Sequence, residues 1–227
     1  MNKDQKPIVS AIIIAGVLIA GAIMLRGSKP PMAQNIPAGN GGTAVTLAPV
    51  GPSDRIFGNP QAKVAVVMYE DFQCPFCEKF FTESETNIRN TYVQNGDVQL
   101  VYRDFAFLGP ESNRAAEAAR CAADQGKFWE YHDYLFTHQN GENEGNFADQ
   151  YLKSFAKNLG LNTNDFDSCL DGGKYVQAVT DQTSEGSAAG VSGTPKGFIL
   201  KDGQITDTID GAEPFATVKA KIDAALK

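Results

Sequence analysis

Two cysteines separated by two residues, Cys74 and Cys77, are the side chains of this sequence best suited to chemistry. They follow an apolar run from Val64 to Tyr69 that is typical of a buried strand, and they open an amphipathic helix. The helix dipole and the free backbone N–H groups at a helix N-terminus stabilise a thiolate placed there. The second sulfur lies one turn further on, so the pair can form and break a small disulfide. This arrangement indicates thiol–disulfide exchange.

The position of each thiol in the helix predicts its role. We expect Cys74, at the helix start, to be the exposed thiolate of low pKa, and Cys77, inside the first turn, to be the buried resolving partner. Pro75 suits the first helical turn, where its missing N–H costs nothing. Phe76 brings no charge to the site.

Zinc binding and a purely structural disulfide are the alternatives for this pair. A zinc site needs four ligands at suitable spacing, but Cys121 and Cys169 stand alone in the sequence, and neither His132 nor His138 has a thiol near it. A structural bridge within the close pair would constrain the unfolded chain very little. Redox chemistry is therefore preferred, with no metal and no cofactor.

The N-terminal residues predict a membrane attachment. Ile8 to Leu25 is uncharged and mostly apolar, at the lower length limit of a membrane-spanning helix. A cleavable signal has a shorter apolar core and a better cut site than the one near Ala33. We expect residues 1–27 to be a retained anchor, with a signal peptide as the alternative. Residues 28–53 are rich in Pro and Gly, as is typical of a spacer.

Charge and redox chemistry limit the partners and the compartment. The 227 residues carry 20 Lys and Arg against 27 Asp and Glu, a formal net charge of −7, so we expect no nucleic-acid partner. A disulfide donor needs an oxidising environment, which predicts a catalytic domain on the outer side of the cell membrane.

The order of the expected elements predicts an α/β domain over residues 54–227. The helix opened by the cysteines runs to about Gln94, and a strand from Val98 to Arg103 completes a βαβ unit with parallel strands. An all-helical insertion over about residues 109–188 interrupts this pattern. A β-hairpin and a last helix then follow, at residues 197–200, 204–209 and 214–224.

Five motifs appear in order: Phe57-Gly-Asn-Pro60, Glu70-Asp-Phe-Gln-Cys-Pro-Phe-Cys77, Tyr102-Arg-Asp-Phe105, Gly126-Lys-Phe-Trp-Glu-Tyr-His132 and Gly193-Thr-Pro195. Through them, from about residue 56 to the C-terminus, the sequence resembles the DsbA-like family of bacterial envelope oxidoreductases. The resemblance implies a thioredoxin-like fold with a helical insertion. It also implies that Thr194 and Pro195 form a cis-proline turn that faces the disulfide and presents backbone to a substrate peptide.

Two positions depart from the family pattern. Family members often have a histidine inside the cysteine pair, where this sequence has Phe76. Many also have an acidic residue six positions before the first cysteine, where it has Met68. Glu70 and Asp71 lie nearer to the first cysteine in the sequence than Met68 does. Their side chains, however, are expected to be free to face solvent. We hypothesise that Lys196, directly after the proline, partly replaces the missing histidine and lowers the pKa of the first cysteine.

Cys121 and Cys169 both lie in the helical insertion. Outside the cytoplasm two spare cysteines usually pair, and some relatives in the resembled family have a second disulfide in this region. Two separate buried thiols remain the alternative, because connectivity does not follow from sequence.

The function expected from these features is that of a membrane-anchored oxidase. It would donate the Cys74–Cys77 disulfide to unfolded or newly exported proteins and be reoxidised by an integral membrane thiol oxidase. A reductase or isomerase of the same fold is the first alternative, because the direction of exchange depends on redox poise. A redox-inert peptide-binding or chaperone module is the alternative from a different class.

Overall fold

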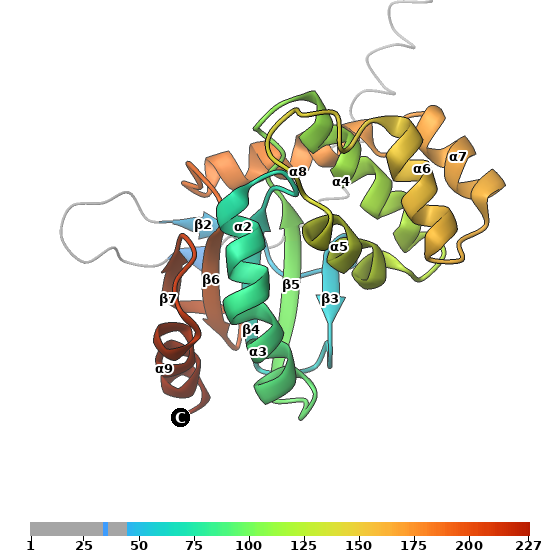
Figure 1. Ribbon diagram of the computed structural model, residues 1–227. Coiled ribbons are helices and arrows are strands. Elements are labelled where there is room, and N and C mark those ends of the chain that lie inside the picture. The colour runs from blue at the N-terminus through green and yellow to red at the C-terminus, as the bar shows by residue number, and fades with distance from the viewer. Residues whose placement is uncertain (1–33, 36–44) are drawn as a thin grey trace, which may run out of the picture. The chain divides into compact units, whose positions relative to one another are not determined.

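A five-stranded mixed sheet forms the centre of the α/β domain (Figure 1). β4 and β5 pair in parallel, and the three other neighbouring pairs are antiparallel. This is the α/β sheet that the βαβ unit and the hairpin predict, so the expected thioredoxin-like fold is confirmed. The strand order is β3 (Arg55–Phe57), β5 (Val98–Asp104), β4 (Val64–Glu70), β6 (Lys196–Lys201) and β7 (Gln204–Asp210).

The computed structural model describes residues 34–35 and 45–227. The expected anchor from Ile8 to Leu25 and most of the expected spacer lie outside these residues. Within the described part of the chain, no helix combines the length and the apolar character needed to cross a bilayer. A separate two-stranded sheet pairs β1 (Gln34–Asn35) with β2 (Thr46–Leu47).

The central strand β4 supplies one set of side chains to each face of the sheet. All seven of its residues are buried. Because successive side chains of a strand point to opposite faces, Met68 packs with Ile88 and Ile222, whereas Val67 belongs to the apolar cluster of the other face. Glu70, two residues past Met68, therefore points to the face covered by the helix that the cysteines open.

That helix begins directly after Cys74 and stays helical through residue 93, close to the expected end at Gln94. Two of its stretches are π-helical, a form with a wider turn that is frequent at functional sites. Its consecutive segments are α2 (Pro75–Phe80), η1 (Phe81–Glu85), α3 (Thr86–Ile88) and η2 (Arg89–Val93).

The helical insertion lies between β5 and β6, as predicted for residues 109–188. Aromatic side chains of its second helix, among them Phe128, Tyr131 and Phe136, are buried in the largest apolar cluster of the described residues. The insertion consists of α4 (Pro110–Ala123), α5 (Phe128–Thr137), α6 (Asp149–Asn158), α7 (Thr163–Asp171) and α8 (Val176–Ala188); α9 (Phe215–Leu226) follows the hairpin.

Two features were not predicted from the sequence. β3 has three residues, too few for a pattern of alternating side chains to be recognised. Residues 45–53, expected to be part of the spacer, contact the domain. Leu47 is buried beside the sheet, and Nη2 of Arg103 donates to the carbonyl of Ala48 at 3.0 Å.

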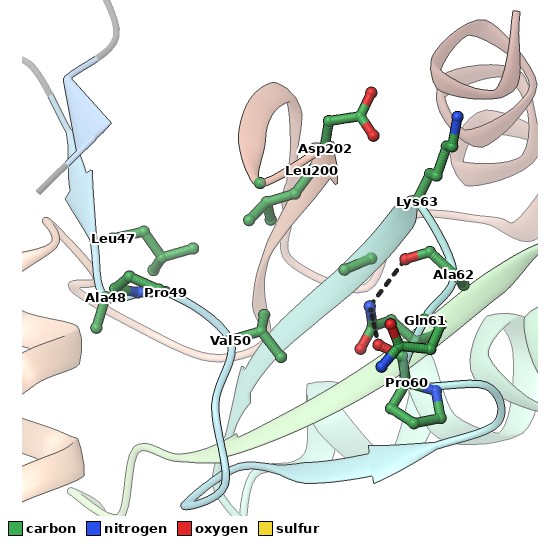
Figure 2. A pocket seen from close by; sticks show the side chains of 13 residues that line it. Leu47, Ala48, Pro49, Val50, Pro60, Gln61, Ala62, Lys63, Leu200 and Asp202 are labelled. Carbon is green, nitrogen blue, oxygen red and sulfur yellow. Dashed lines mark hydrogen bonds between the residues drawn. The ribbon is translucent and has the colours of Figure 1, made fainter. Parts of the chain in front are cut away.

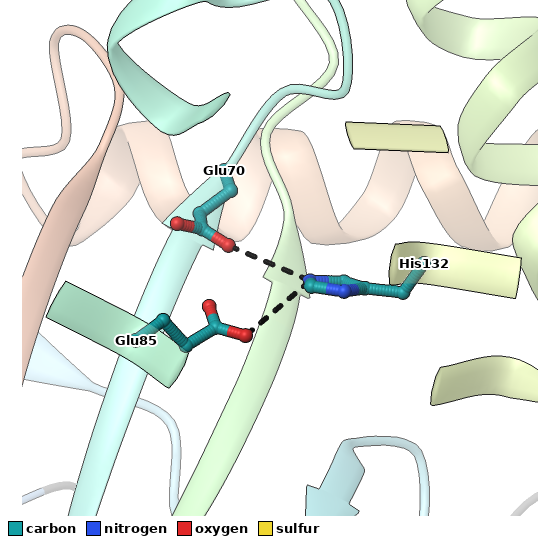
Figure 3. A group of neighbouring side chains, drawn as sticks. All are labelled: Glu70, Glu85 and His132. Atoms are coloured by element: carbon teal, nitrogen blue, oxygen red, sulfur yellow. Dashed lines mark ion pairs between the residues drawn. The ribbon is translucent and has the colours of Figure 1, made fainter. Parts of the chain in front are cut away.

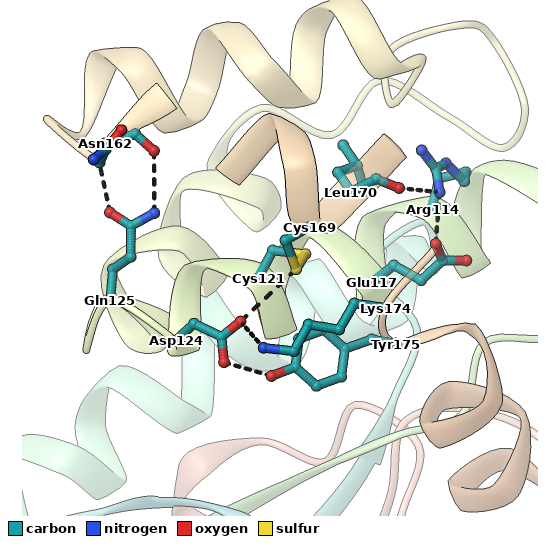
Figure 4. Close-up of a disulfide and its surroundings, with 10 residues drawn as sticks. All are labelled: Arg114, Glu117, Cys121, Asp124, Gln125, Asn162, Cys169, Leu170, Lys174 and Tyr175. Carbon is teal, nitrogen blue, oxygen red and sulfur yellow. Dashed lines mark hydrogen bonds and ion pairs between the residues drawn. A yellow bond between two sulfur atoms is a disulfide. The ribbon is translucent and has the colours of Figure 1, made fainter. Parts of the chain in front are cut away.

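Cys121 of α4 and Cys169 of α7 form a disulfide with a Cα–Cα distance of 5.9 Å (Figure 4). Asp124 lies beside it and accepts hydrogen bonds from Lys174 Nζ at 2.7 Å and Tyr175 Oη at 2.5 Å. The structure thus contains the pairing that the sequence left open, and it connects two helices of the insertion.

Replacing both cysteines by serine is expected to lower the free energy of unfolding by about 2–4 kcal/mol. The bridge spans 48 residues, so its removal releases a long loop in the unfolded chain. Urea denaturation of the wild type and the Cys121→Ser/Cys169→Ser variant measures the difference. Equal midpoints and slopes would contradict the expectation.

Candidate active site

The start of α2 places the sulfur of Cys74 among free backbone N–H groups. Cys74 is the N-cap residue, and its carbonyl accepts the first helical hydrogen bonds from the N–H groups of Cys77 at 3.0 Å and Glu78 at 3.1 Å. Pro75 occupies the first helical position, as predicted. The N–H groups of Phe76 and Cys77 act on the Cys74 sulfur and lower its pKa.

The two thiols have pKa values shifted in opposite directions. The pKa of Cys74 is lowered to about 6, mainly by a hydrogen bond from Cys77; burial opposes this effect, and the side chain of Thr194 adds to the lowering. The pKa of Cys77 is raised well above its ordinary value, mainly by burial and also by the negative charge of Glu70. At neutral pH the pair therefore consists of one thiolate and one thiol that keeps its proton.

Cys74 is less exposed than the sequence led us to expect. Its exposed fraction is 5%, against 0% for Cys77. The sulfur is covered by the loop before β6, since Sγ of Cys74 lies 3.4 Å from the carbonyl of Thr194, to which the protonated thiol donates. Phe76, between the two cysteines, is 63% exposed, so an apolar side chain lies at the surface next to the dithiol.

The Thr194-Pro195 peptide bond is cis, as the family resemblance implied. The antiparallel pairing of β4 with β6 places Tyr69 opposite Lys196, which brings the turn before β6 next to the end of β4. Thr194 contacts the Cys74 sulfur and also lines a hollow of about 360 Å³. A peptide held in this hollow would lie next to the thiolate. The lining residues are Gly190, Ser192, Gly193, Thr194, Pro195, Lys196, Asp210 and Gly211.

Lys196 does not have the surroundings that the hypothesis required. Its ammonium forms an ion pair with Asp210 and lies 5.5 Å from the centre of the Phe198 ring. The main causes of the lowered pKa of Cys74 are Cys77, Thr194 and backbone N–H groups, not Lys196. Because Asp210 offsets the charge of Lys196, the structure does not support a role for Lys196 in lowering the pKa of Cys74.

Glu70 and Asp71 are buried, contrary to the expectation that they point to solvent. Asp71 fixes the loop before the cysteines, since its carboxylate accepts from the N–H groups of Gln73 at 2.9 Å and Phe107 at 2.9 Å. Burial raises the pKa of Glu70 to about 7. Glu70 shares the face of β4 with Met68, one step of the alternation nearer the dithiol, so the site keeps a buried acid although Met68 is apolar.

His132 and Glu85 complete a buried cluster that the sequence did not reveal (Figure 3). His132 projects from α5, and its Nε2 lies 3.9 Å from Oε2 of Glu70 and 3.9 Å from Oε1 of Glu85. One signal was available: His132 follows Phe128 by four residues, which places it on the apolar face of its helix. Helical spacing reveals this burial but not the distant carboxylates.

A second cavity, of about 320 Å³, lies at the start of β4 (Figure 2). The dithiol follows the other end of this strand. The cavity is lined by the start of β4 and the β6–β7 turn, among them Lys63 and Asp202. Gln99 crosses its wall and donates to the carbonyl of Ala62 at 3.0 Å. No sequence-predicted site residue lines it.

Fold and site define a dithiol protein of the thioredoxin class, with an N-cap cysteine facing a cis-proline turn. A family model described as Thioredoxin matches residues 51–224, most of the chain. The chain therefore belongs to this thioredoxin family, and its helical insertion makes it DsbA-like. Family, fold and dithiol together make it a thiol:disulfide oxidoreductase.

Solved structures show the same fold. Oxidised BdbD from Bacillus subtilis aligns with a TM-score of 0.72 at 22% identity, over 80% of this chain and 97% of that chain. Wolbachia pipientis alpha-DsbA1 gives a TM-score of 0.69 at 20% identity, over 78% and 92%. A thioredoxin-like oxidoreductase from Silicibacter pomeroyi DSS-3 gives 0.65 at 24% identity, over 77% and 93%.

Curated relatives share sequence over part of their length. Na(+)/H(+) antiporter NhaA 3 of Salinispora tropica is 35% identical over 156 residues, 67% of this chain and 22% of that protein. Na(+)/H(+) antiporter NhaA of Herminiimonas arsenicoxydans is 30% identical over 180 residues, 79% of this chain and 27% of that protein. The chain thus spans about a quarter of the length of these relatives, and the printed antiport activity is that of those whole proteins.

The pH dependence of alkylation tests the two thiol pKa values. Because the thiolate is the nucleophile, the rate at Cys74 should rise with pH, reach half its maximum near pH 6 and level off about one unit higher. Cys77 should stay unmodified. Iodoacetamide labelling of the reduced protein, followed by mass spectrometry, measures both. In denaturant the pH midpoint of Cys74 alkylation should move to about 8.5. A midpoint of about 8.5 in the folded protein as well would contradict the low pKa of Cys74.

Two substitutions at the cis-proline turn separate the proposed causes of the low pKa. Thr194→Val removes the hydroxyl, so alkylation of Cys74 at pH 6 should slow by about twofold or more. Lys196→Ala should leave the midpoint near 6, because Asp210 already offsets that charge. Thiolate absorbance titration of both variants provides the comparison. If only Lys196→Ala raised the titration midpoint of Cys74, Lys196 and not Thr194 would be the residue that lowers its pKa.

Proposed function

We propose that the chain is an extracytoplasmic disulfide oxidase that donates the Cys74–Cys77 disulfide to unfolded or newly exported proteins. The observation that carries this proposal is the low pKa of Cys74, about 6. A stabilised thiolate favours the reduced enzyme and so makes its disulfide a better oxidant. Relative to an ordinary thiol, this shift favours the dithiol about tenfold at pH 7, or by about 30 mV.

The geometry fits a two-step exchange. A substrate thiolate attacks Sγ of Cys74, forming a mixed disulfide while Cys77 leaves as a thiolate and takes up a proton. The raised pKa of Cys77 favours that protonation, so the mixed disulfide is not at once reversed. A second substrate thiolate then attacks the substrate sulfur of the mixed disulfide. Cys74 leaves readily because its thiolate is stable, and the substrate has gained the disulfide.

The hollow at the cis-proline turn supports a peptide substrate. Three glycines, Gly190, Gly193 and Gly211, line it and leave backbone groups uncovered by side chains, and Thr194 contacts the nucleophile. Backbone recognition does not depend on substrate sequence, and the exposed Phe76 adds an apolar contact next to the sulfur. Both features suit unfolded chains, which expose backbone and apolar side chains together.

The compartment and the membrane partner belong to the same proposal. A disulfide between Cys121 and Cys169 supports an oxidising compartment, because such bridges are rare in the cytosol. We propose that Ile8 to Leu25 anchors the domain in the cell membrane as a single span. An integral membrane thiol oxidase would then reoxidise Cys74 and Cys77 after each cycle.

A reductase or isomerase remains the alternative with the same chemistry, and the equilibrium reduction potential distinguishes them. The oxidase proposal requires that the Cys74–Cys77 pair, equilibrated with glutathione, has a potential nearer about −120 mV than about −270 mV, a larger difference than the thiolate of Cys74 alone supplies. Alkylation of the reduced fraction and mass spectrometry measure this. A value in the lower range would favour a reductase and contradict the oxidase.

Serine variants test the redox-inert alternative. Cys74→Ser should abolish oxidation of a reduced, unfolded protein. Cys77→Ser, mixed instead with a disulfide-bonded protein, should accumulate a mixed disulfide: the Cys74 thiolate attacks one sulfur, the other leaves as a thiolate, and no resolving thiol is present. The Cys121→Ser/Cys169→Ser variant should remain active and serves as the control for cysteine loss. Unchanged function in Cys74→Ser would support a chaperone or peptide-binding module instead.

A further inference from the structure

Three side chains from different elements converge in the core behind the dithiol. Glu70 ends β4, Glu85 ends η1 and His132 lies in α5, and one ligand atom of each lies within 4.8 Å of the others. Among the described residues, neither oxygen of Glu70 nor Nε2 of His132 has a hydrogen-bond partner. All three side chains are at most 1% exposed. Unpartnered acceptors in a dry core require a cation, either protons or a metal ion.

The distances favour a metal ion over a shared proton. Nε2 of His132 lies 3.9 Å from each carboxylate, beyond the range of a hydrogen bond. Bonds of about 2.1 Å to zinc place tetrahedral ligands roughly 3.4 Å apart and can hold two ligands at most about 4.2 Å apart. The separation of 3.9 Å lies between these values, so a small closing movement of the side chains would bring two ligands onto one ion (Figure 3).

The other ring nitrogen of His132 has the partner that a metal-bound histidine usually has. Nδ1 lies 2.8 Å from Oδ1 of Asp133. Nη2 of Arg89 also lies near Nδ1, at the longer distance of 3.3 Å. With the shorter contact to Asp133 as the hydrogen bond, Nδ1 carries the proton, and the lone pair on Nε2 is free to bind an ion. Asp133 is itself held by Arg89, whose Nη1 donates to both of its oxygens at 2.9 Å.

The charged side chains of the cluster have a net negative charge that a dication would balance. Arg89 lies 2.5 Å from Glu85 and also pairs with Asp133, so its single positive charge faces two carboxylates. With a neutral His132, the four charged side chains Glu70, Glu85, Asp133 and Arg89 sum to −2. A divalent ion would balance this charge in a core that is costly for uncompensated ions.

We propose that Glu70, Glu85 and His132 bind one divalent transition-metal ion of the zinc class. Glu70 would bind through its two unpartnered oxygens, His132 through Nε2 and Glu85 through Oε1, which would give the four donors that zinc prefers. Oε1 of Glu85 also lies 2.5 Å from Nη2 of Arg89, so this oxygen would be shared between the guanidinium and the ion. The rings of Phe72, Phe81 and Phe136 surround the imidazole at centroid distances of 4.8–5.7 Å and fix its orientation.

The proposal does not depend on the direction of electron flow at the dithiol.

Metal analysis of the full-length chain tests the site. The protein is produced with added zinc sulfate, oxidised so that Cys74 and Cys77 cannot bind zinc, and dialysed against metal-free buffer. The wild type should retain one zinc per chain and lose thermal stability when a strong chelator removes it. Glu70→Gln and His132→Asn, which nearly preserve side-chain volume, should weaken zinc binding by about tenfold or more.

A matched control uses the other histidine of the chain. His138 is the exposed C-cap residue of α5, so His138→Asn should retain zinc as the wild type does. Asp133→Asn should weaken binding without abolishing it, since Asp133 only orients His132. Circular dichroism of each variant checks its fold, and the wild-type result decides the question even if a variant unfolds.

Two results would overturn the proposal. A wild-type chain without zinc, and without a zinc-dependent change in thermal unfolding, would mean that the cluster holds protons only. Equal zinc in the wild type, Glu70→Gln and His132→Asn would assign the ion to the surface. Because the dithiol is oxidised throughout, neither result bears on the oxidase proposal.

Discussion

The contact between the sulfur of Cys74 and the turn at Thr194 is the interaction on which the rest of the site depends. It joins residues 120 positions apart, at a distance of 3.4 Å. The start of α2 alone would supply N–H groups to the sulfur, but the turn adds cover, a tuning side chain and a hollow beside it. This contact exists because β6 pairs antiparallel with β4, which places the residue before β6 at the end of β4.

The same strand organises the buried side of the site. Alternation along β4 turns Glu70 toward the helix opened by the cysteines, where Glu85 lies, while the insertion supplies His132 from α5. Ionisable groups in such a core are costly unless they are compensated. Among the described residues, both oxygens of Glu70 and Nε2 of His132 lack a hydrogen-bond partner, which is the observation behind the proposed metal site.

The two thiols illustrate how one short motif acquires two chemistries. Cys74 and Cys77 are separated by one helical turn, yet one faces N–H groups and the other an apolar core with a buried acid. Hydrogen bonds at Cys74 and burial at Cys77, not residue type, separate their pKa values. The departures from the family pattern, Phe76 and Met68, are compatible with this separation because Thr194 and Glu70 act on the two sulfurs instead.

The sequence by itself determined the dithiol, its place at a helix start, the βαβ unit and the helical insertion, because periodicity and end signals are local. It did not reveal β3, which is too short, or the ionic partners of Lys196 and His132. Those partners, Asp210 and the pair Glu70 and Glu85, lie on other elements, and local spacing contains no information about them. The pairing of strands and the packing of α5 decided which charges meet, and with them the burial and the charge of Glu70 that raise the pKa of Cys77.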